Sequence, residues 1–443
     1  MKKLFLLLLL PLAVKSQHIA KNADQLLSAY HKQDLFTGNV LIAKQGKVIF
    51  SKSYGMADRE SEKKNNIQTT FRIGSISKSF TAVLILQLQE KGLLNIEDNL
   101  GRYFPSFPKA DSIKLKHLLS NSSGIRDFIG MVGIAKWSTV KSYKELIDTV
   151  SGKSLKFTPG KEFDYSSSNF LLLAAIAEQV TGKDYVSLLN TNIIKKIGLT
   201  NTGMDKLARA DKSQAMGYMV SAKNFYNRVG EMNIGILSGA GGMYSSTEDL
   251  LKFDQALYNN SLLSKKSRTL LFTPNLGNYG LGWEIIEQDG VKSIGHSGAI
   301  DGFKSNLIRF PEQNITLIIL SNYYDIQSFE LYGELRKVAL GKDFQLPSNH
   351  NFVNLSIDKL QKYTGDYEIN EKMKLTVSIK DKMLTVSLPG SGDMLLYPES
   401  EADFYIRSNN AYGKFIQDPD TNIISLQLIK GKRISTWKKL QTK

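Results

Sequence analysis

The stretch Phe71-Arg-Ile-Gly-Ser-Ile-Ser-Lys-Ser-Phe-Thr81 decides how this chain is interpreted. Gly74 precedes an uncharged, largely apolar run over residues 79–89, which predicts a buried helix. Ser75 and Lys78 lie three residues apart, so they share one face of the first helical turn beside its positive end. A lysine amine held in a desolvated pocket can lose its proton and then activate a serine hydroxyl. From these four residues alone, however, a helix-capping serine with a solvated lysine is the preferred interpretation.

Two later segments place further polar side chains at boundaries between elements. In Phe157-Thr-Pro-Gly-Lys-Glu-Phe-Asp-Tyr-Ser-Ser-Ser-Asn169, Tyr165 follows a Pro-Gly turn and precedes a predicted helix, where a tyrosine can exchange a proton with a serine. In Ile294-Gly-His-Ser-Gly-Ala-Ile-Asp-Gly302, Gly298 lets a backbone N–H approach a ligand closely. Core packing of Tyr165 and backbone bonding of His296 are reasonable alternatives for each residue alone. Three such features in this order are much less expected by chance.

Together these segments resemble the β-lactamase-related serine hydrolases, a family that groups class C β-lactamases, D,D-peptidases, D-aminopeptidases and related esterases. The resemblance covers about residues 23–335. It rests on five segments in the family's order: Ile73-Gly-Ser-Ile-Ser-Lys-Ser-Phe80, His117-Leu-Leu-Ser-Asn-Ser-Ser-Gly124, Pro159-Gly-Lys-Glu-Phe-Asp-Tyr-Ser166, Gly241-Gly-Met-Tyr-Ser-Ser-Thr-Glu-Asp-Leu250 and Gly295-His-Ser-Gly298. It implies an α+β fold with an antiparallel sheet flanked by helices and an inserted helical lobe.

The resemblance also implies roles for individual residues. Ser75 would be the acylated nucleophile, Lys78 its base, and Tyr165 the group that carries a proton to the leaving group. The backbone N–H groups of Ser75 and Ala299 would form an oxyanion hole, typically worth roughly 3–4 kcal/mol per donor. His117 would cap or pack at the start of a structural helix.

Two positions depart from the family's pattern. Ser167 stands where asparagine is usual, which removes an amide that would orient the lysine, and Asn169 is not expected to replace it. His296-Ser297-Gly298 occupies the Lys-Thr-Gly position, as in the esterase and aminopeptidase branches. A neutral histidine would attract a substrate carboxylate only weakly and in a pH-dependent way, so efficient β-lactamase activity is not expected. The expected oxyanion and substrate-binding residues are therefore Ala299, His296, Gly298 and Ser167.

The strand and helix patterns predict how the chain is organised. A hairpin over residues 38–52 and strands over residues 291–321 predict one mixed sheet built from both ends, with a helical lobe inserted between them. Short alternating strands over residues 355–443 predict a small barrel or sandwich. Tyr363-Thr-Gly-Asp-Tyr367 resembles the β-barrel that follows many such hydrolase domains. The expected division is a signal peptide (1–16), a hydrolase domain (17–345) and a C-terminal β-barrel-like domain (355–443).

Composition excludes several other kinds of chemistry. The 443 residues include no cysteine, so disulfides, thiolate zinc sites, Fe–S clusters and a cysteine nucleophile are excluded. Two lysines, the apolar run Leu4–Val14 and small residues at its exit are typical of a secretory signal, so we expect a periplasmic or extracellular protein. The net charge of +15 comes mostly from scattered lysines, which does not indicate a nucleic-acid groove.

Three alternatives compete with this interpretation. An α/β-hydrolase is disfavoured because the chain contains no Gly-x-Ser-x-Gly, and a metalloenzyme because it contains no His-Glu-x-x-His. A catalytically weak or inactive penicillin-binding-like protein that binds or senses the envelope stays open because of Ser167. The preferred hypothesis is an exported serine hydrolase acting on a small ester or amide, such as a D-amino-acid peptide, with weak β-lactamase activity at most. It needs no cofactor or metal, and the sequence does not predict its oligomeric state.

Overall fold

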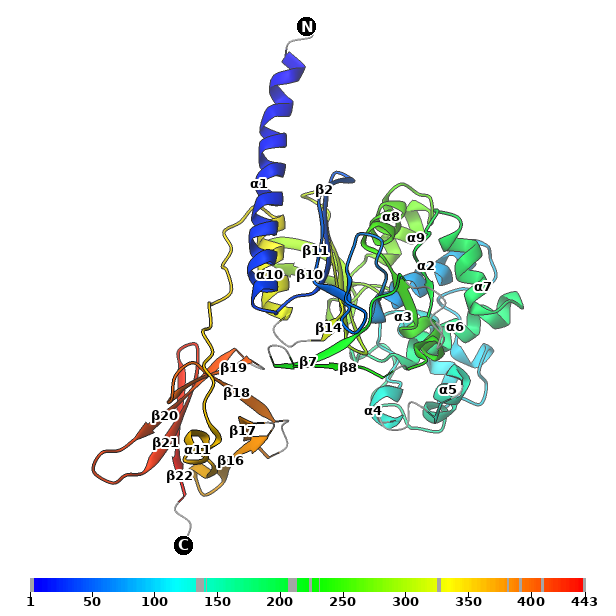
Figure 1. Cartoon of the computed structure of the whole chain (residues 1–443). Helices are drawn as coiled ribbons and strands as arrows, with labels where there is room; N and C mark the ends of the chain where they lie inside the picture. Colours follow the sequence, from blue (N-terminus) through cyan, green and yellow to red (C-terminus); the bar gives the residue numbers. More distant parts are fainter. Residues whose placement is uncertain are drawn as a thin grey trace.

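A six-stranded sheet forms the centre of the larger part of the molecule (Figure 1). The computed structural model describes residues 4–132, 139–140, 142–205, 213–222, 225–230, 232–324, 328–380, 382–389, 393–407 and 410–440. The strands follow the spatial order β10 (Glu284–Gln288), β11 (Val291–Ile300), β12 (Phe303–Phe310), β13 (Ile315–Ser321), β1 (Gly38–Lys44) and β2 (Lys47–Tyr54). Every neighbouring pair is antiparallel, and β1 from the start of the chain lies against β13. The predicted sheet built from both ends is therefore confirmed, with all of its strands antiparallel.

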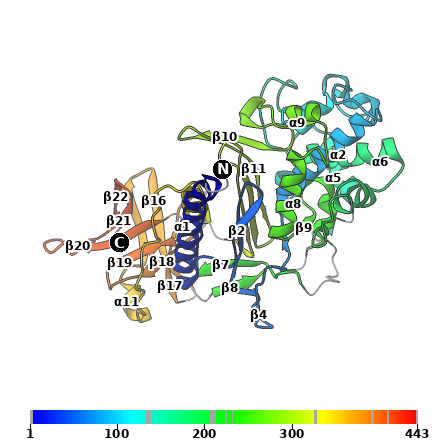
Figure 2. The ribbon, with the colours of Figure 1, turned by 90° about the horizontal axis from the view of Figure 1, so that it is seen from above.

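Helices cover both faces of this sheet (Figure 2). On one face lie α1 (Leu4–Lys32) and α10 (Ser328–Ala339); apolar side chains of α1 from Ile19 onward and of α10 share a core with the sheet. On the other face lies the helical lobe, inserted between β2 and β10. Its helices are α2 (Ser77–Glu90), α3 (Leu115–Leu119), α4 (Phe128–Val132), α5 (Tyr143–Ser151), α6 (Ser168–Thr181), α7 (Tyr185–Leu189), α8 (Thr247–Tyr258) and α9 (Lys265–Leu271). Short strands join these elements: β3 (Met56–Asp58), β4 (Lys63–Lys64), β5 (Phe71–Arg72), β6 (Gly203–Met204), β7 (Tyr218–Ala222), β8 (Phe225–Arg228), β9 (Met243–Ser245) and β14 (Tyr323–Tyr324).

Helix α2 is the central element of the lobe. Its residues from Ser77 to Leu88 are all buried, as the uncharged run in the sequence predicts for a core helix. The Phe80 ring stacks on Phe253 of α8, with 3.8 Å between the ring centroids. Burial on every side fixes α2 against the sheet, and its first turn carries Lys78 into the interior.

The C-terminal region forms a closed eight-stranded barrel, which confirms the predicted β-rich fold. Its strands are β15 (Gly365–Asn370), β16 (Met373–Lys380), β17 (Met383–Ser387), β18 (Met394–Pro398), β19 (Asp403–Ile406), β20 (Ala411–Gln417), β21 (Ile424–Lys430) and β22 (Arg433–Lys439). The short helix α11 (Ile357–Gln361) precedes it. Aromatic rings fill part of the interior, where Tyr363 stacks on Phe415 with 4.0 Å between centroids.

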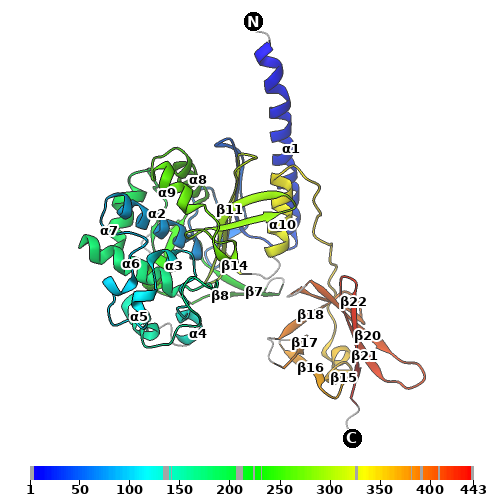
Figure 3. The same ribbon diagram turned by 180° about the vertical axis from the view of Figure 1, so that it is seen from behind.

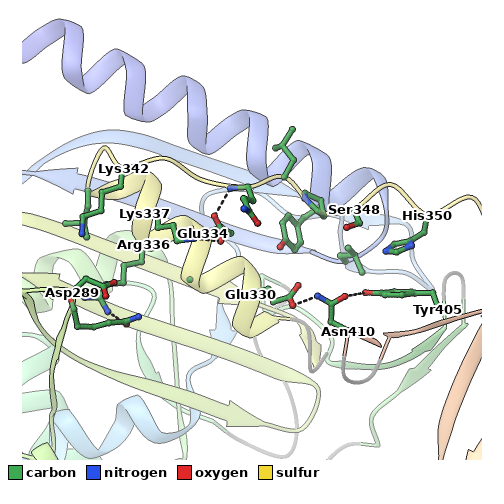
Figure 4. Close-up of a pocket in the computed structure, with 18 residues that line it drawn as sticks. Asp289, Glu330, Glu334, Arg336, Lys337, Lys342, Ser348, His350, Tyr405 and Asn410 are labelled. Carbon is green, nitrogen blue, oxygen red and sulfur yellow. Dashed lines mark hydrogen bonds and ion pairs between the residues drawn. The ribbon is translucent and has the colours of Figure 1, made fainter. Parts of the chain in front are cut away.

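A long segment connects α10 to the barrel (Figure 3). Beside it lies a cavity of about 350 Å³, lined by residues of α10, of this segment and of the barrel (Figure 4). Within it, the Asn410 amide donates to Glu330 of α10 and accepts from the Tyr405 hydroxyl at 3.0 Å. Side-chain hydrogen bonds thus connect the barrel to the larger part of the molecule.

The N-terminal helix α1 includes most of the predicted signal peptide. Helix α1 begins at Leu4 and continues without a break to Lys32, because the apolar run is also compatible with helix. Residues 1–3 of the predicted signal peptide lie outside the described residues, and the predicted domain boundaries stay predictions. Within the described part of the chain, no helix is long and apolar enough to cross a membrane.

Candidate active site

Ser75 lies where the sheet meets the helical lobe. It is in the short 3₁₀ turn Gly74–Ile76, immediately before α2, and its side chain is half-buried. Gly74 has φ of +50°, and a Cβ there would lie 3.0 Å from the Ala299 nitrogen on β11. The Ser77 hydroxyl donates to the Gly74 carbonyl at 2.7 Å and fixes the turn. These contacts place the backbone next to Ser75 directly against Ala299.

Lys78 is fully buried and reaches back to Ser75. Its Nζ donates to the Ser75 Oγ at 3.1 Å and to the Ala240 carbonyl at 2.7 Å. Burial lowers the pKa of Lys78 to about 7, because an ammonium loses its hydration there, whereas the charge of Asp127 opposes this shift. Near neutral pH a large fraction of Lys78 is therefore the free amine, which can accept a proton from a hydroxyl.

Tyr165 covers the same pair of residues from the loop before α6. Its ring centroid lies 4.9 Å from Lys78 Nζ, and its hydroxyl hydrogen-bonds Ser75. Burial raises the pKa of Tyr165 above its usual value, although the bond to Ser75 opposes the shift. The phenol is thus protonated at neutral pH. The structure brings together the three residues that the sequence analysis proposed as catalytic, while their roles stay predictions.

Asn121 and Ser123, from the segment after α3, hold the Tyr165 loop in place. The Asn121 Oδ1 accepts from the Ser166 amide at 3.2 Å and from the Asn169 side-chain amide at 3.0 Å. Asn169 also accepts from the Ser123 hydroxyl at 2.6 Å and is fully buried. Its amide is therefore occupied in this network and does not stand in for the asparagine missing at position 167. Ser167 itself precedes α6 and lines the cavity beside Ser75.

The start of α3 carries His117, which the sequence analysis assigned to capping or packing. Its Nδ1 accepts the Lys114 backbone hydrogen at 3.1 Å, in a reciprocal cap at the first turn. This confirms the capping interpretation.

Strand β11 brings Gly298 and Ala299 beside the Ser75 turn. A Cβ on Gly298 would lie 2.1 Å from the Ile73 carbonyl oxygen, so only glycine permits this approach. The Ser305 hydroxyl of β12 donates to the same carbonyl at 2.8 Å. The Ala299 backbone thus lies against Gly74, as an oxyanion hole shared with Ser75 requires.

The His296 side chain is buried and does not face a substrate. Its imidazole is 1% exposed, with Nδ1 donating to the Ser297 carbonyl at 2.6 Å and Nε2 accepting from the Tyr279 hydroxyl at 2.8 Å. Because a carbonyl can only accept, Nδ1 carries the hydrogen, and in the neutral ring Nε2 is then free to accept from the Tyr279 hydroxyl. Burial lowers the pKa of His296, which favours the neutral ring. His296 therefore presents no cation to the cleft; it positions Tyr279, whose ring packs edge-on against Tyr165.

Sequence reasoning missed Tyr279, Asp127 and Glu284. Tyr279 opens the glycine-rich run Tyr279-Gly-Leu-Gly-Trp283, which is the one local signal that pointed to it. The two carboxylates lie near the site from different elements, since Asp127 interacts electrostatically with Lys78, and both interact with Tyr165. Burial raises the pKa of Asp127.

A second glycine-rich segment supports Lys78 from the opposite side. Ser238 has φ of +41°, a strained conformation for a residue with a side chain, just before the Ala240 carbonyl that accepts from Lys78. A Cβ on Gly239 would lie 2.7 Å from the Phe170 carbonyl oxygen, so the segment packs closely on α6. This strain is stored next to the site.

An apolar cavity of about 530 Å³ opens beside Ser75. Its walls are formed by Phe128, Ile129, Met219, Val229, Met232, Leu237, Ile300 and Tyr324, with Ala299 and Gly302 at the strand end. Asp301 also lines it, but its carboxylate is ion-paired with the buried Arg72 guanidinium at 2.9 Å. The cavity therefore suits an apolar group. Across the described residues, no group of three histidine or carboxylate side chains is arranged to hold a metal ion.

An antiparallel sheet, a helical lobe and a serine, a lysine and a tyrosine at their boundary define the β-lactamase-related class. The chain belongs to the Beta-lactamase family of serine hydrolases, whose sequence profile matches residues 22–339. It is 28% identical over 432 residues to a penicillin-binding protein of Bacillus subtilis (strain 168), covering 91% of this chain and 95% of the relative. It is 34% identical over 327 residues to a second protein of that strain, PbpX, which is also named as a penicillin-binding protein. This match covers 73% of this chain and 80% of the relative. Among solved structures, the octameric penicillin-binding protein homologue from Pyrococcus abyssi superposes with a TM-score of 0.65 and 26% identity, covering 93% of this chain and 98% of that one.

Proposed function

We propose that the protein is an exported serine hydrolase that forms an acyl-enzyme on Ser75 from a small ester or amide with an apolar acyl group. The observation that carries this proposal is the buried Lys78 amine, 3.1 Å from the Ser75 hydroxyl and with a pKa lowered to about 7. An amine that is partly deprotonated at neutral pH and in contact with a hydroxyl is the arrangement that activates a serine. Export is inferred from the sequence of residues 1–16 alone.

Acylation follows from the positions of three side chains. The Ser75 proton passes to Lys78 Nζ as the oxygen attacks the substrate carbonyl. The resulting oxyanion accepts hydrogen bonds from the Ser75 and Ala299 backbone N–H groups, which are rigidly placed before reaction. Tyr165 donates its proton to the leaving group and is reprotonated from Lys78, so the bond to the leaving group breaks as the acyl-enzyme forms. Water then attacks the acyl carbonyl by the same steps in reverse, and the acid leaves.

The apolar cavity indicates which kind of acyl group the substrate carries. Its walls offer methyl, thioether and aromatic surfaces, and among the described wall residues the one carboxylate, that of Asp301, is paired with Arg72. An aliphatic or aromatic acyl group buries surface there, whereas a charged one loses hydration without a partner. Esters or amides of apolar acids, including D-amino acids with apolar side chains, fit best.

Covalent labelling tests the proposal. The purified protein is exposed to a fluorophosphonate or a penicillin and digested, and mass spectrometry locates the adduct. We expect labelling of Ser75, no labelling in Ser75→Ala, and turnover of a p-nitrophenyl ester by the wild type only. Modification of other serines with Ser75 untouched would overturn the assignment.

One observation favours a second function, that of a binding or sensing module. Ser167 lacks the amide that the family uses beside the lysine, and Asn169 is occupied elsewhere. Binding of a β-lactam or D-peptide without turnover of any ester, β-lactam or D-peptide would establish this alternative.

A further inference from the structure

We propose that Glu284 is a specificity-determining residue that keeps anionic leaving groups away from Ser75, an inference that rests on the proposed hydrolase function. Glu284 is the first residue of β10, and its carboxylate accepts a hydrogen bond from the Ser297 hydroxyl at 3.0 Å. Nothing in the family resemblance assigns it a role.

The strand pairing places Glu284 at the entrance to the free edge of β11. Pairing between β10 and β11 ends with Glu284 opposite Gly295, while β11 continues to Ile300. Ser297 and Ala299 are both exposed and lie on the same side of the strand, about 7 Å apart at the usual rise per residue. Ser297 is therefore the neighbour of the proposed oxyanion donor in the direction of β10.

The two ends of this edge have different chemistry. The stretch from Ala299 to Gly302 lines the apolar cavity, which would take the acyl group. With the carbonyl oxygen between Ser75 and Ala299, the leaving group extends in the opposite direction, toward Ser297 and Glu284. A leaving group at this end contacts the Ser297 hydroxyl, which already donates its hydrogen to the Glu284 carboxylate.

The negative charge of Glu284 interacts electrostatically with the groups proposed to react. The Glu284 side chain is about one-third exposed, and its charge contributes to raising the pKa of Tyr165 and of Tyr279. His296 Nδ1 lies 4.0 Å from the Glu284 carboxylate but is neutral through burial, so it does not cancel that charge. Asp127 adds a second negative charge near Tyr165.

A carboxylate on the leaving group would thus face the like charge of Glu284. For an assumed separation of about 7 Å between the two negative charges, effective dielectric constants of about 20 to 80 correspond to a discrimination of roughly 50- to 3-fold. Such repulsion selects neutral or cationic leaving groups by excluding the alternative.

A matched pair of thioesters tests this inference. Both carry the same benzoylglycyl acyl group; one leaving group is mercaptoacetate and the other is its uncharged N-methylamide. We expect the wild type to prefer the uncharged thioester in kcat/KM. In Glu284→Gln, which keeps an acceptor for Ser297, kcat/KM for the mercaptoacetate thioester should rise about tenfold, and that for the uncharged one should change less than about threefold. The exposed Glu287, on the same strand, provides the matched control Glu287→Gln, which should leave the preference unchanged.

The outcomes separate two kinds of failure. If the uncharged thioester is not hydrolysed, the proposed function is contradicted. The preference is then measured as the ratio of binding affinities for two boronic acids, one with and one without a carboxylate. If the ratio in Glu284→Gln equals that of the wild type in either measurement, or if Glu287→Gln shifts it equally, Glu284 has no such role. Raising the salt concentration should shrink the wild-type preference, because the repulsion acts partly through solvent.

Discussion

The Lys78 amine lies 3.1 Å from the Ser75 hydroxyl and is fully enclosed by protein. Enclosure matters as much as distance, because an exposed lysine keeps its proton at neutral pH and cannot act as a base. The 3₁₀ turn that contains Ser75 leads directly into α2, whose buried first turn contains Lys78, so the chain provides both the short distance and the enclosure.

The pH dependence of activity should follow the protonation of Lys78. Because burial lowers its pKa to about 7, the amine becomes free as the pH rises through that value. We expect kcat/KM for a neutral p-nitrophenyl ester to increase with pH along a limb with an apparent pKa near 7. Lys78→Ala should reduce turnover by roughly 10²- to 10⁴-fold. Lys183→Ala, at an exposed position on the same lobe, is the control; unchanged turnover in Lys78→Ala would remove this residue from the mechanism.

Asp127 should influence the pH at which kcat/KM rises. Its negative charge favours the ammonium form of Lys78, so it raises the pKa of Lys78 against the effect of burial. In Asp127→Asn the pKa of Lys78 falls further, and the acid limb of kcat/KM moves to lower pH. Asp148→Asn removes an exposed carboxylate from α5 and should leave the profile in place. A limb that moves to higher pH in Asp127→Asn would contradict this electrostatic coupling.

Tyr165→Phe should separate esters from amides. The phenol is placed to protonate the leaving group, which an amine needs and a p-nitrophenolate does not. We expect an anilide of the same acyl group to lose far more activity, about 10²-fold or more, than the p-nitrophenyl ester. Equal losses on both substrates, with unchanged thermal stability, would show that Tyr165 acts only by positioning.

The apolar cavity should make activity depend on acyl chain length. Each methylene buried there contributes about 0.8 kcal/mol, or about fourfold in kcat/KM, until the cavity of about 530 Å³ is filled. The series p-nitrophenyl acetate, butyrate and hexanoate measures this directly. A flat or falling series would indicate that the acyl group binds elsewhere.

Local patterns predicted much of the fold and part of the site. The uncharged run after Ser75 predicted α2, and the apolar runs within residues 291–321 predicted β11 to β13, because these elements are largely buried. The placement of His296 was not predictable: whether a strand residue faces the cleft or lies beneath it depends on the register against β12. Glu284 looked like an ordinary strand residue, and its relevance comes only from the point where β10 ends. Local alternation does not encode that point.

Gly298→Ala should test the close approach of β11 to the Ser75 turn. A Cβ there would lie 2.1 Å from the Ile73 carbonyl oxygen and 2.4 Å from the Ser305 hydroxyl, so β11 must move away from the turn. We expect a loss of roughly 1–3 kcal/mol in the free energy of unfolding. Activity should fall further than stability explains, because the Ala299 N–H moves with the strand and the oxyanion hole widens. Gly333→Ala is the matched control: its Cβ meets nothing within 4 Å, and a helical alanine should stabilise α10 by about 0.5–1 kcal/mol. Urea unfolding and ester turnover, measured on both variants, distinguish this local effect from a general response to an added methyl group.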